Sequence, residues 1–231
     1  MQMIKLYDLA GRDETVRFSP FCWRTRLALA HKGLPVETVP WRFTEKDVIA
    51  FSGQGLVPVL VDGGRVISDS WAIARYLDDT YADLPRLFAN EQARALTAFV
   101  NDWTDTVLNP AVRQIILPDI VPLLHDKDRA YFIASREKRF GLKMNAYKEK
   151  RDSFLAQAST CLAPLRLVLA RQAYLGGGQP SYADHVAMSA FIWSKICSPV
   201  RLWSVGDPLA IWFERMFSAH ESVMRGARFQ W

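Results

Sequence analysis

The chain has 231 residues, of which 50% are hydrophobic and 23% charged, and its formal net charge is +5. This length is enough for one large domain or two ordinary ones, and the composition is typical of a globular protein with a core of its own. No stretch approaches the run of about 20 apolar residues that spans a bilayer, so we expect no membrane partner.

The first third of the chain alternates between strand and helix patterns. A strand pattern over Met3–Tyr7 precedes a helix pattern over Pro20–Lys32, in which Ala and Leu recur. The elements predicted next are a strand over 36–39, a short helix over 44–51 with Thr44 as its N-cap, a strand over Val57–Val61, a turn at 62–64, a return strand over 65–67 and a helix over 69–81. The order βαβαββα excludes a plain dinucleotide-binding unit, because the last two strands form a hairpin. It predicts a mixed four-stranded sheet with helices on its faces.

Helical periodicity begins after a connector at residues 82–86 and continues almost to the end of the chain. Glu91–Leu117 repeats apolar residues at helical spacing, and Pro110 is a predicted kink. Further helices are predicted across Lys127–Ala158, Cys161–Ala173, Ser181–Ser194 and Asp207–Ala219. We therefore predict an α/β domain over residues 1–84 and an all-helical domain over residues 90–231.

The positive charge is concentrated in the second of these domains. The stretch Lys127–Arg151 contains nine basic and three acidic residues. It is interpreted either as a strip that binds anions or nucleic acid or as a solvated helix face. We favour the solvated face, since Glu137 and Glu149 are interspersed and aromatic residues are sparse, so no nucleic-acid partner is expected.

The cysteines and histidines indicate neither a disulfide framework nor a metal site. The three cysteines are odd in number and form no CxxC pair, and the N-terminus lacks a secretory-signal pattern, which favours a reducing, cytoplasmic compartment. The glycine run at 176–178 lacks the rest of a phosphate-binding loop. No metal-ligand spacing is found among His31, His125, His185 and His220, so we expect no metal.

One short stretch, Phe18–Arg24 with the sequence FSPFCWR, resembles a dithiol redox motif whose first cysteine is a serine. Ser19 followed by Pro20 is the preferred pairing at a helix N-cap and its first turn. A helix N-terminus also favours an anion, so the Ser19 hydroxyl can cap the helix and donate a hydrogen bond to a bound thiolate. Cys22 has no partner cysteine at position 19 and is expected to pack as a small apolar residue.

Two further motifs point to a ligand. A proline that opens a strand, as in Val57–Pro58, lies at a sheet edge or forms a cis bond. Asp69 and Ser70 open the next helix, where a carboxylate and a hydroxyl stand beside free backbone N–H groups. This arrangement suits a group that carries both ammonium and carboxylate, as the end of an amino acid does.

Together these residues resemble the glutathione-binding domain of the cytosolic glutathione transferases. Val57–Pro58 matches the Val-cis-Pro of that family, Asp69–Ser70 matches its acidic-Ser pair, and Ser181–Asp184 resembles the N-capping box of its helical domain. Within the family, the chain is similar to the bacterial β-etherases and the fungal etherase-related transferases. That similarity rests on the loop Asp8–Phe18, Ser19-Pro20 and Phe43-Thr44.

The resemblance implies a thioredoxin-like first domain, a homodimer, and glutathione as cosubstrate with no metal. It implies that Ser19 stabilises the glutathione thiolate, which attacks a hydrophobic, aromatic electrophile in a conjugation or an aryl-ether cleavage. The residues expected to bind glutathione are Gln54, Val57, Pro58, Asp69, Ser70, Trp41 and Lys46. The residues expected to line the second-substrate site are Phe21, Trp103, Thr106 and Val107, with Phe191 and Trp193 as further candidates.

Two other functions stay open on the sequence. The first is a protein that binds glutathione or a hydrophobic ligand without turning it over, because a fold does not determine an activity. The second is a thiol-disulfide oxidoreductase or deglutathionylase that acts through Cys22. The serine at position 19 argues against this second function.

Overall fold

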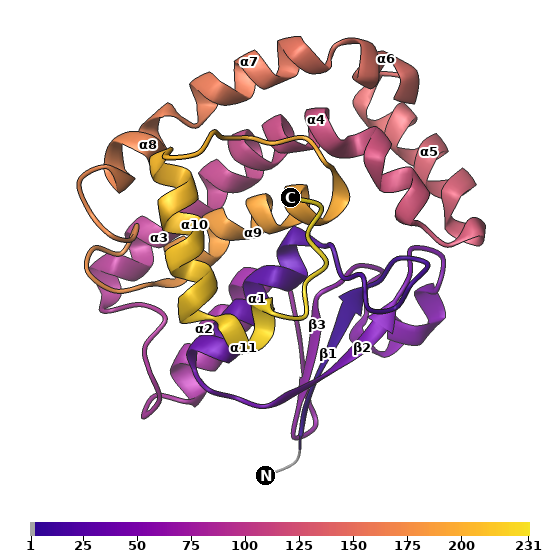
Figure 1. Ribbon diagram of the computed structural model, residues 1–231. Coiled ribbons are helices and arrows are strands. Elements are labelled where there is room, and N and C mark those ends of the chain that lie inside the picture. The colour runs from indigo at the N-terminus through magenta and orange to yellow at the C-terminus, as the bar shows by residue number, and fades with distance from the viewer. Residues whose placement is uncertain (1–2) are drawn as a thin grey trace.

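The computed structural model describes residues 3–231 and places a four-stranded sheet before a series of helices (Figure 1). The strand order is β2-β1-β3-β4, in which β1 is parallel to β2 and antiparallel to β3, and β3 is antiparallel to β4. The predicted mixed sheet and its hairpin are confirmed. The strands are β1 (Ile4–Leu9), β2 (Val36–Trp41), β3 (Val59–Asp62) and β4 (Arg65–Ser68).

The helix α1 (Pro20–His31) connects β1 to β2, the 3-10 helix η1 (Lys46–Ser52) lies between β2 and β3, and α2 (Ser70–Thr80) follows β4. The short helix predicted over 44–51 is the 3-10 helix η1, and Thr44 does not cap it. The backbone N–H and the hydroxyl of Thr44 instead donate to the carboxylate of Asp128, at 2.9 and 2.7 Å. Thr44 therefore fastens the loop after β2 to the helical part of the chain.

The rest of the chain is helical, as predicted, but it is divided more finely. The stretch predicted as helical over Lys127–Ala158 forms three helices, and the first of them ends at Gly141, whose φ of 71° is accessible to glycine at no steric cost. The helical elements are α3 (Glu91–Trp103), the π-helical turn η2 (Thr104–Leu108), α4 (Asn109–Ile120), η3 (Val121–Leu123), α5 (Asp126–Phe140), α6 (Met144–Glu149), α7 (Arg151–Cys161), α8 (Ala163–Leu169), α9 (Tyr182–Cys197), α10 (Pro208–Ala219) and α11 (Glu221–Met224).

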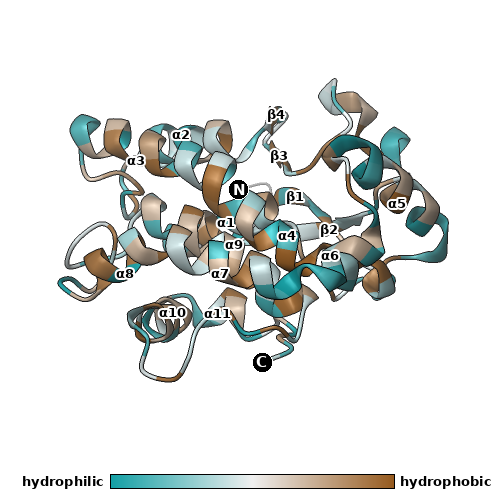
Figure 2. Ribbon diagram, turned by 90° about the horizontal axis from the view of Figure 1, so that it is seen from above, coloured by the Kyte–Doolittle hydropathy of each residue, from teal (hydrophilic) through white to brown (hydrophobic). Residues whose placement is uncertain are grey.

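The main hydrophobic core joins the sheet side of the molecule to the helices. Leu9 of β1 and Trp23 and Leu27 of α1 belong to the same buried cluster as residues of α4, α9 and α10. Figure 2 shows α1 and α9 side by side near the centre of the molecule, with α5 at one end and α3 and α8 at the other. Within residues 3–231, no helix combines the length and the apolarity needed to cross a membrane.

Candidate active site

Ser19 lies at the N-terminus of α1, where the sequence predicts a helix cap. Its Oγ accepts a hydrogen bond from the backbone N–H of Cys22 at 3.3 Å, and Pro20 occupies the first turn. The Ser19 O–H donates to no nitrogen or oxygen atom in the described part of the chain. The side chain also forms a hydrogen bond with the Cys22 thiol and lines a cavity, so a ligand there can compete with that thiol for the hydroxyl proton.

Val57 and Pro58 face the N-terminus of α1 across two adjoining cavities. The peptide bond between them is cis, and Val57 lines both cavities. The smaller cavity, of about 170 Å³, is lined by Phe21, Gln54, Leu56, Val57, Pro58, Asp69 and Ser70. The structure thus brings together five of the seven residues that the sequence assigns to glutathione.

Asp69 combines a helix cap with an unusual backbone conformation. Its Oδ1 accepts hydrogen bonds from the N–H groups of Trp71 and Ala72, both at 2.9 Å, at the start of α2. Its φ of 77° makes it the only residue besides glycine with a positive φ among those the structure describes. Such a conformation costs free energy and occurs most often at functional sites, which directs attention to the cavity that Asp69 and Ser70 line.

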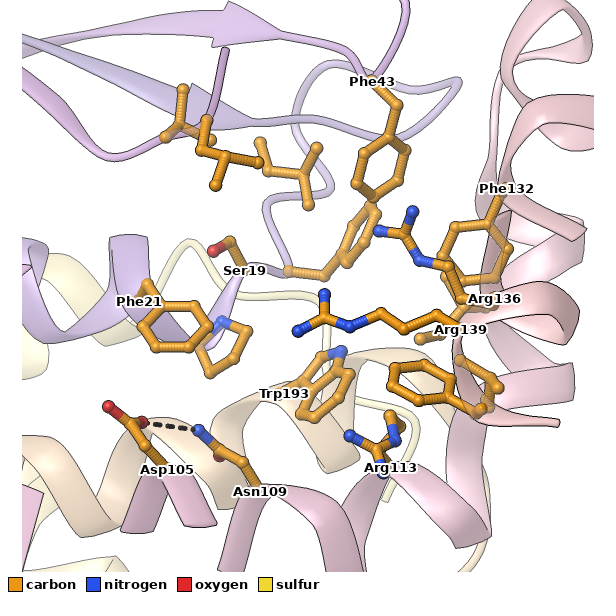
Figure 3. Close-up of a pocket in the computed structure, with 18 of the residues that line it drawn as sticks. Ser19, Phe21, Phe43, Asp105, Asn109, Arg113, Phe132, Arg136, Arg139 and Trp193 are labelled. Atoms are coloured by element: carbon orange, nitrogen blue, oxygen red, sulfur yellow. Dashed lines mark hydrogen bonds between the residues drawn. The ribbon is translucent and has the colours of Figure 1, made fainter. Parts of the chain in front are cut away.

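The larger cavity, of about 380 Å³, lies between the loop that precedes α1 and helices α4, α5 and α9. Ser19 and Phe21 stand on one side of it and three arginines on the other (Figure 3). Its apolar lining includes Phe43, Phe132 and Trp193. A cavity of this size that is apolar with a few convergent polar groups is typical of a small-molecule site.

The residues predicted for the second substrate divide into two groups. Phe21 and Trp193 line the larger cavity. Four others do not line either cavity. Thr106 and Val107 are exposed, and Phe191 is fully buried in the core. Trp103 is half-buried at the end of α3.

The segment η2–α4 lines the larger cavity with a face different from the predicted one. The π-helical turn η2 adds a residue to one turn, which rotates the side chains that follow it. Asp105, Asn109 and Arg113, spaced four residues apart, line the cavity in place of Trp103, Thr106 and Val107, and Asn109 and Arg113 follow this turn. The sequence predicted a kink at Pro110 and carried no signal for the π turn.

Trp41 and Lys46 lie next to each other at the margin of the site. The indole N–H of Trp41 donates to the carbonyl oxygen of Glu45 at 2.6 Å, and its buried ring contributes to the wall of the larger cavity. The Lys46 ammonium lies 4.8 Å from the centre of that ring and donates to the carbonyl oxygen of Gly55. Lys46 lines neither cavity, because these contacts hold it against its own loop.

Cys22 is fully buried in the first turn of α1. Burial, together with the carboxylate of Asp8, raises the pKa of the Cys22 thiol well above its ordinary value of 9.0. A thiol acts as a nucleophile only as the thiolate. Cys22 therefore has the character of a packing residue, which favours the serine as the reactive position of this motif.

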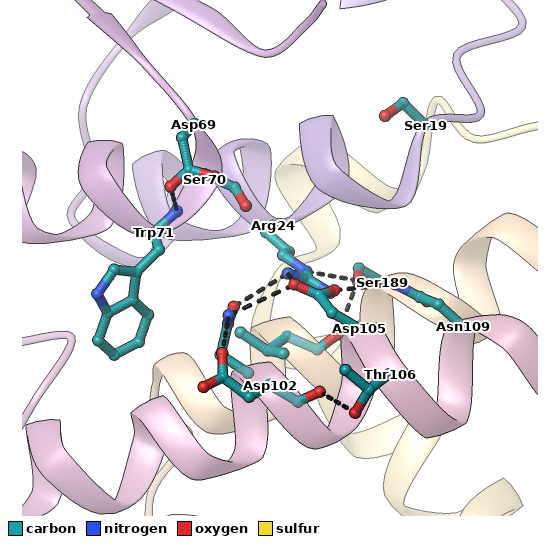
Figure 4. A network of polar contacts seen from close by, with 12 residues as sticks. Ser19, Arg24, Asp69, Ser70, Trp71, Asp102, Asp105, Thr106, Asn109 and Ser189 are labelled. Carbon is teal, nitrogen blue, oxygen red and sulfur yellow. Dashed lines mark hydrogen bonds and ion pairs between the residues drawn. The ribbon is translucent and has the colours of Figure 1, made fainter.

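A buried ion pair links α1 to the wall of the larger cavity (Figure 4). Arg24, whose side chain is 1% exposed, donates to both carboxylate oxygens of Asp105, at 2.6 and 3.3 Å. It also donates to Asn101 on α3 at 3.0 Å and to Ser189 on α9 at 3.3 Å. Arg24 therefore joins three helices behind the site and neutralises the one carboxylate that lines the cavity.

Sequence analysis missed the role of the arginines in this cavity. Arg136 and Arg139 belong to the basic stretch Lys127–Arg151, which we interpreted as a solvated helix face, and Arg113 lies outside that stretch. The structure directs all three side chains into the larger cavity (Figure 3). The excess of basic residues was a signal, but it does not identify which of them point inward.

Three histidines far apart in the sequence meet between α1, α9 and the end of α10. His31, His185 and His220 each place a ring nitrogen within 4.8 Å of the others. Sequence analysis predicted no metal-ligating arrangement and missed this cluster. Spacing along one segment contains no information on which residues of different helices come into contact. Burial lowers the pKa of all three imidazoles, that of His220 to about 4, so the cluster is neutral near pH 7.

Two family models match the chain, one over the sheet domain and one over the helical domain. Residues 18–80 match the model of the glutathione S-transferase N-terminal domain, and residues 95–205 match that of the C-terminal domain. Glutathione S-transferase Z2 of Arabidopsis thaliana is 41% identical over 78 residues, which is 32% of this chain and 35% of the relative. A zeta-class glutathione S-transferase of Euphorbia esula is 39% identical over 100 residues, covering 41% and 44%. The chain thus spans about a third to under half of the length of these curated relatives.

Solved structures extend the likeness to nearly the whole chain. A glutathione S-transferase of Ceriporiopsis subvermispora, solved in complex with glutathione, is 25% identical with a TM-score of 0.84, covering 96% of this chain and 98% of that one. A glutathione transferase of Phanerochaete chrysosporium shares the fold with a TM-score of 0.84 at 24% identity, covering 95% and 98%. With both domain models matched in order along one chain that has this fold, the protein belongs to the glutathione S-transferase family.

Proposed function

We propose that the protein is a glutathione transferase of the serine type. In this proposal, glutathione occupies the two adjoining cavities, and its thiolate attacks a hydrophobic, aromatic electrophile in the larger one. The observation that carries the proposal is the position of Ser19. Its hydroxyl, with a proton available to a ligand, stands at a helix N-terminus in a cavity that also includes Val57 of the cis Val57–Pro58 bond.

Ser19 performs the activation of the thiol. A free thiol titrates near pH 8.5, so little thiolate is present at neutral pH. A hydrogen bond from the Ser19 hydroxyl and the positive end of the α1 dipole both favour the charged form and lower the pKa of the thiol. In the complex, the Ser19 oxygen still accepts the hydrogen bond that caps the helix, and the hydroxyl also donates one to the glutathione sulfur.

The smaller cavity suits the γ-glutamyl end of glutathione. Asp69 and Ser70 offer a carboxylate and a hydroxyl at the N-terminus of α2, where the positive end of the helix dipole favours a carboxylate. Val57 offers its backbone groups to the peptide unit of the cysteine, and Gln54 is proposed for the glycyl end. Trp41 and Lys46 also stay candidates for the glycyl end. They would act by supporting the segment between β2 and β3, through their contacts with Glu45 and Gly55.

The reaction itself is a displacement at carbon. The thiolate forms a carbon–sulfur bond while the bond to the leaving group breaks with its electron pair, so no oxidant or reductant is needed. The leaving group is a halide in a conjugation and an aryloxide in the cleavage of an aryl ether. We include ether cleavage because of the serine-type motif and the long loop before α1. The principal contribution of the protein is to hold the thiolate and the carbon at reacting distance.

We extend the proposal to the state of the protein in the cell. It is proposed to work as a homodimer in the cytoplasm. The three cysteines are free, which suits a reducing compartment, and the family resemblance implies the dimer.

The pKa of the glutathione thiol in the complex tests the proposal. It can be followed through the ultraviolet absorbance of the thiolate. In the wild type we expect the bound thiol to titrate below about 8.5. In Ser19→Ala we expect the value to return toward 8.5, with kcat/KM about 10- to 100-fold lower, because a hydrogen bond to a charged group contributes about 1.5–3 kcal/mol.

Ser181→Ala is the matched control, because Ser181 caps α9 through a capping box and lies outside both cavities. It should lower stability and leave the thiol pKa unchanged. If Ser19→Ala behaves like this control, Ser19 is only a helix cap and the proposed activation is wrong. Saturable glutathione binding without turnover of aromatic halides or aryl ethers would instead show a binding protein.

A further inference from the structure

One wall of the larger cavity carries three positive charges that no carboxylate neutralises. Arg113 of α4 and Arg136 and Arg139 of α5 line this wall, opposite Ser19 and Phe21 (Figure 3). Within residues 3–231, none of the three forms an ion pair. Neighbouring basic residues outside the cavity do so, since Arg129 pairs with Asp126, Lys143 with Glu137 and Arg151 with Asp119.

The one acidic side chain in the cavity does not compensate for this charge. Asp105 lines the opposite part of the cavity, and both of its carboxylate oxygens accept hydrogen bonds from Arg24. Its negative charge is therefore already paired. The cavity as a whole presents a net positive potential to whatever enters it.

The three guanidinium groups are packed against aromatic rings. The Cζ atom of Arg113 lies 3.8 Å from the ring centre of Phe140, and that of Arg139 lies 5.4 Å from the same centre. The Cζ atom of Arg136 lies 4.8 Å from the ring centre of Phe43 and 4.7 Å from that of Phe132. These contacts restrain the guanidinium planes of the half-buried Arg113 and Arg136, so less side-chain entropy is lost there when an anion binds, while Arg139 is exposed.

The guanidinium of Arg113 is also incompletely hydrogen-bonded. Its Nε is buried and has no hydrogen-bond partner in the described structure. Burial lowers the pKa of Arg113 and of Arg136, which shows that both charges are partly removed from water. A buried donor without a partner costs free energy, and an acceptor brought by a ligand removes that cost.

From this wall we infer that the second substrate is an aromatic anion, with a carboxylate as its charged group. The inference rests on the proposed function, because it assigns one end of the electrophile to the arginines and the reacting carbon to the side of Ser19. The phenylalanines and Trp193 would enclose the aromatic ring between those two ends. A carboxylate matches the fork of a guanidinium better than a neutral polar group does.

Glutathione itself carries a glycyl carboxylate, and the test must separate it from the electrophile. The separation is made by the Michaelis constants. If the arginines hold the electrophile, their replacement raises KM for the anionic electrophile only. If they hold the glycyl end, replacement raises KM for glutathione with charged and neutral electrophiles alike, and the inference is overturned.

The kinetic experiment uses two electrophiles of similar shape, the anionic 4-chloro-3,5-dinitrobenzoate and the neutral 4-chloro-3,5-dinitrobenzamide. The carboxamide activates the ring more than the carboxylate does, so each kcat/KM is divided by the rate constant of the uncatalysed reaction with glutathione, and these ratios are compared below. In each, the thiolate forms a bond to the carbon that carries chlorine, and chloride leaves with the electron pair. We expect the wild type to favour the carboxylate by about tenfold or more in kcat/KM, the size of a charge-assisted hydrogen bond. Arg113→Gln, Arg136→Gln and Arg139→Gln should each reduce this preference several-fold, because kcat/KM falls further for the carboxylate than for the amide.

Arg171→Gln is the matched control, since Arg171 is exposed and lines neither cavity. It should behave as the wild type with both electrophiles. Equal kcat/KM for the two electrophiles in the wild type overturns the inference. So does an equal loss with both of them in the three arginine variants.

A binding experiment keeps the inference testable if the proposed activity fails. The fluorescent anion 8-anilinonaphthalene-1-sulfonate is compared with neutral N-phenyl-1-naphthylamine, which has the same aromatic rings without the sulfonate. We expect the anion to bind about tenfold more tightly, and this difference to shrink in Arg136→Gln but not in Arg171→Gln. Binding without turnover would refute the transferase and leave the anion site standing, whereas equal affinity for the two probes refutes the anion site.

Discussion

The buried pair between Arg24 and Asp105 makes a quantitative prediction, and the perturbation is Asp105→Asn. Asparagine keeps the shape of the side chain and one acceptor oxygen but removes the negative charge. Arg24 would then remain in the interior with only the neutral oxygens of Asn101, Ser189 and the new amide as acceptors (Figure 4). The variant therefore removes the charge, and it also turns one acceptor oxygen into an NH2 group that faces the donors of Arg24 and of Asn101 or Asn109.

The expected magnitude follows from the burial of the two partners. Breaking a fully buried ion pair by removing one charge costs about 3–5 kcal/mol. The side chain of Asp105 is 32% exposed while that of Arg24 is 1% exposed, so solvent screens part of this interaction. We expect Asp105→Asn to lower the free energy of unfolding by about 2–3 kcal/mol.

The assay is urea unfolding, followed by tryptophan fluorescence and by circular dichroism, with linear extrapolation to zero denaturant. Coincidence of the two transitions establishes that a two-state free energy applies. Asp102→Asn is the control, because Asp102 lies three residues before Asp105 at the end of α3, is exposed, and forms no ion pair within the described residues. Its effect should stay within about 0.5 kcal/mol.

A double-mutant cycle decides whether the two charges act on each other. Arg24→Met removes the cation, and the double variant Arg24→Met/Asp105→Asn removes both charges. We expect a coupling free energy of about 1–3 kcal/mol, so the double variant is more stable than the sum of the single losses implies. Additive losses, or an Asp105→Asn loss no larger than that of Asp102→Asn, would refute the reasoning.

Three further predictions concern the thiols, the histidines and one close backbone contact. In the native protein, Ellman's reagent should modify the half-buried Cys161 and leave the buried Cys22 intact until urea is added. Rapid reaction of Cys22 with loss of activity would contradict its assignment as a packing residue. Burial lowers the pKa of His220 from 6.5 to about 4, so between these values the unfolded chain holds a proton that the native chain lacks. The free energy of unfolding should therefore fall by up to about 3 kcal/mol as the pH drops through this window. His220→Gln should abolish this part of the pH dependence. Parallel curves of stability against pH for the wild type and the variant would contradict this prediction. Gly11→Ala places a Cβ 2.7 Å from the carbonyl oxygen of Leu123 and should cost about 1–3 kcal/mol in urea unfolding, while Gly178→Ala, with open space around it, should be silent.

The sequence by itself determined the elements whose signals are short-range. Ser19 before Pro20 predicted a helix start, and the structure has that cap in place. The turn at 62–64 predicted the β3–β4 hairpin, and the element order predicted the mixed sheet. These predictions succeeded because caps, turns and strand alternation depend on residues within a few positions of one another.

Tertiary structure alone decided which side chains meet in the larger cavity. Asp105, Asn109 and Arg113 line this cavity, and the π turn η2, which sets the orientation of the residues that follow it, has no signal in the local sequence. Packing also turned Arg136 and Arg139 inward from a stretch that composition alone describes as a charged helix face. The same holds for His31 of α1, His185 of α9 and His220, which lies between α10 and α11. Contacts between distant segments depend on how helices rotate and pack against one another, and spacing along the chain does not contain that information.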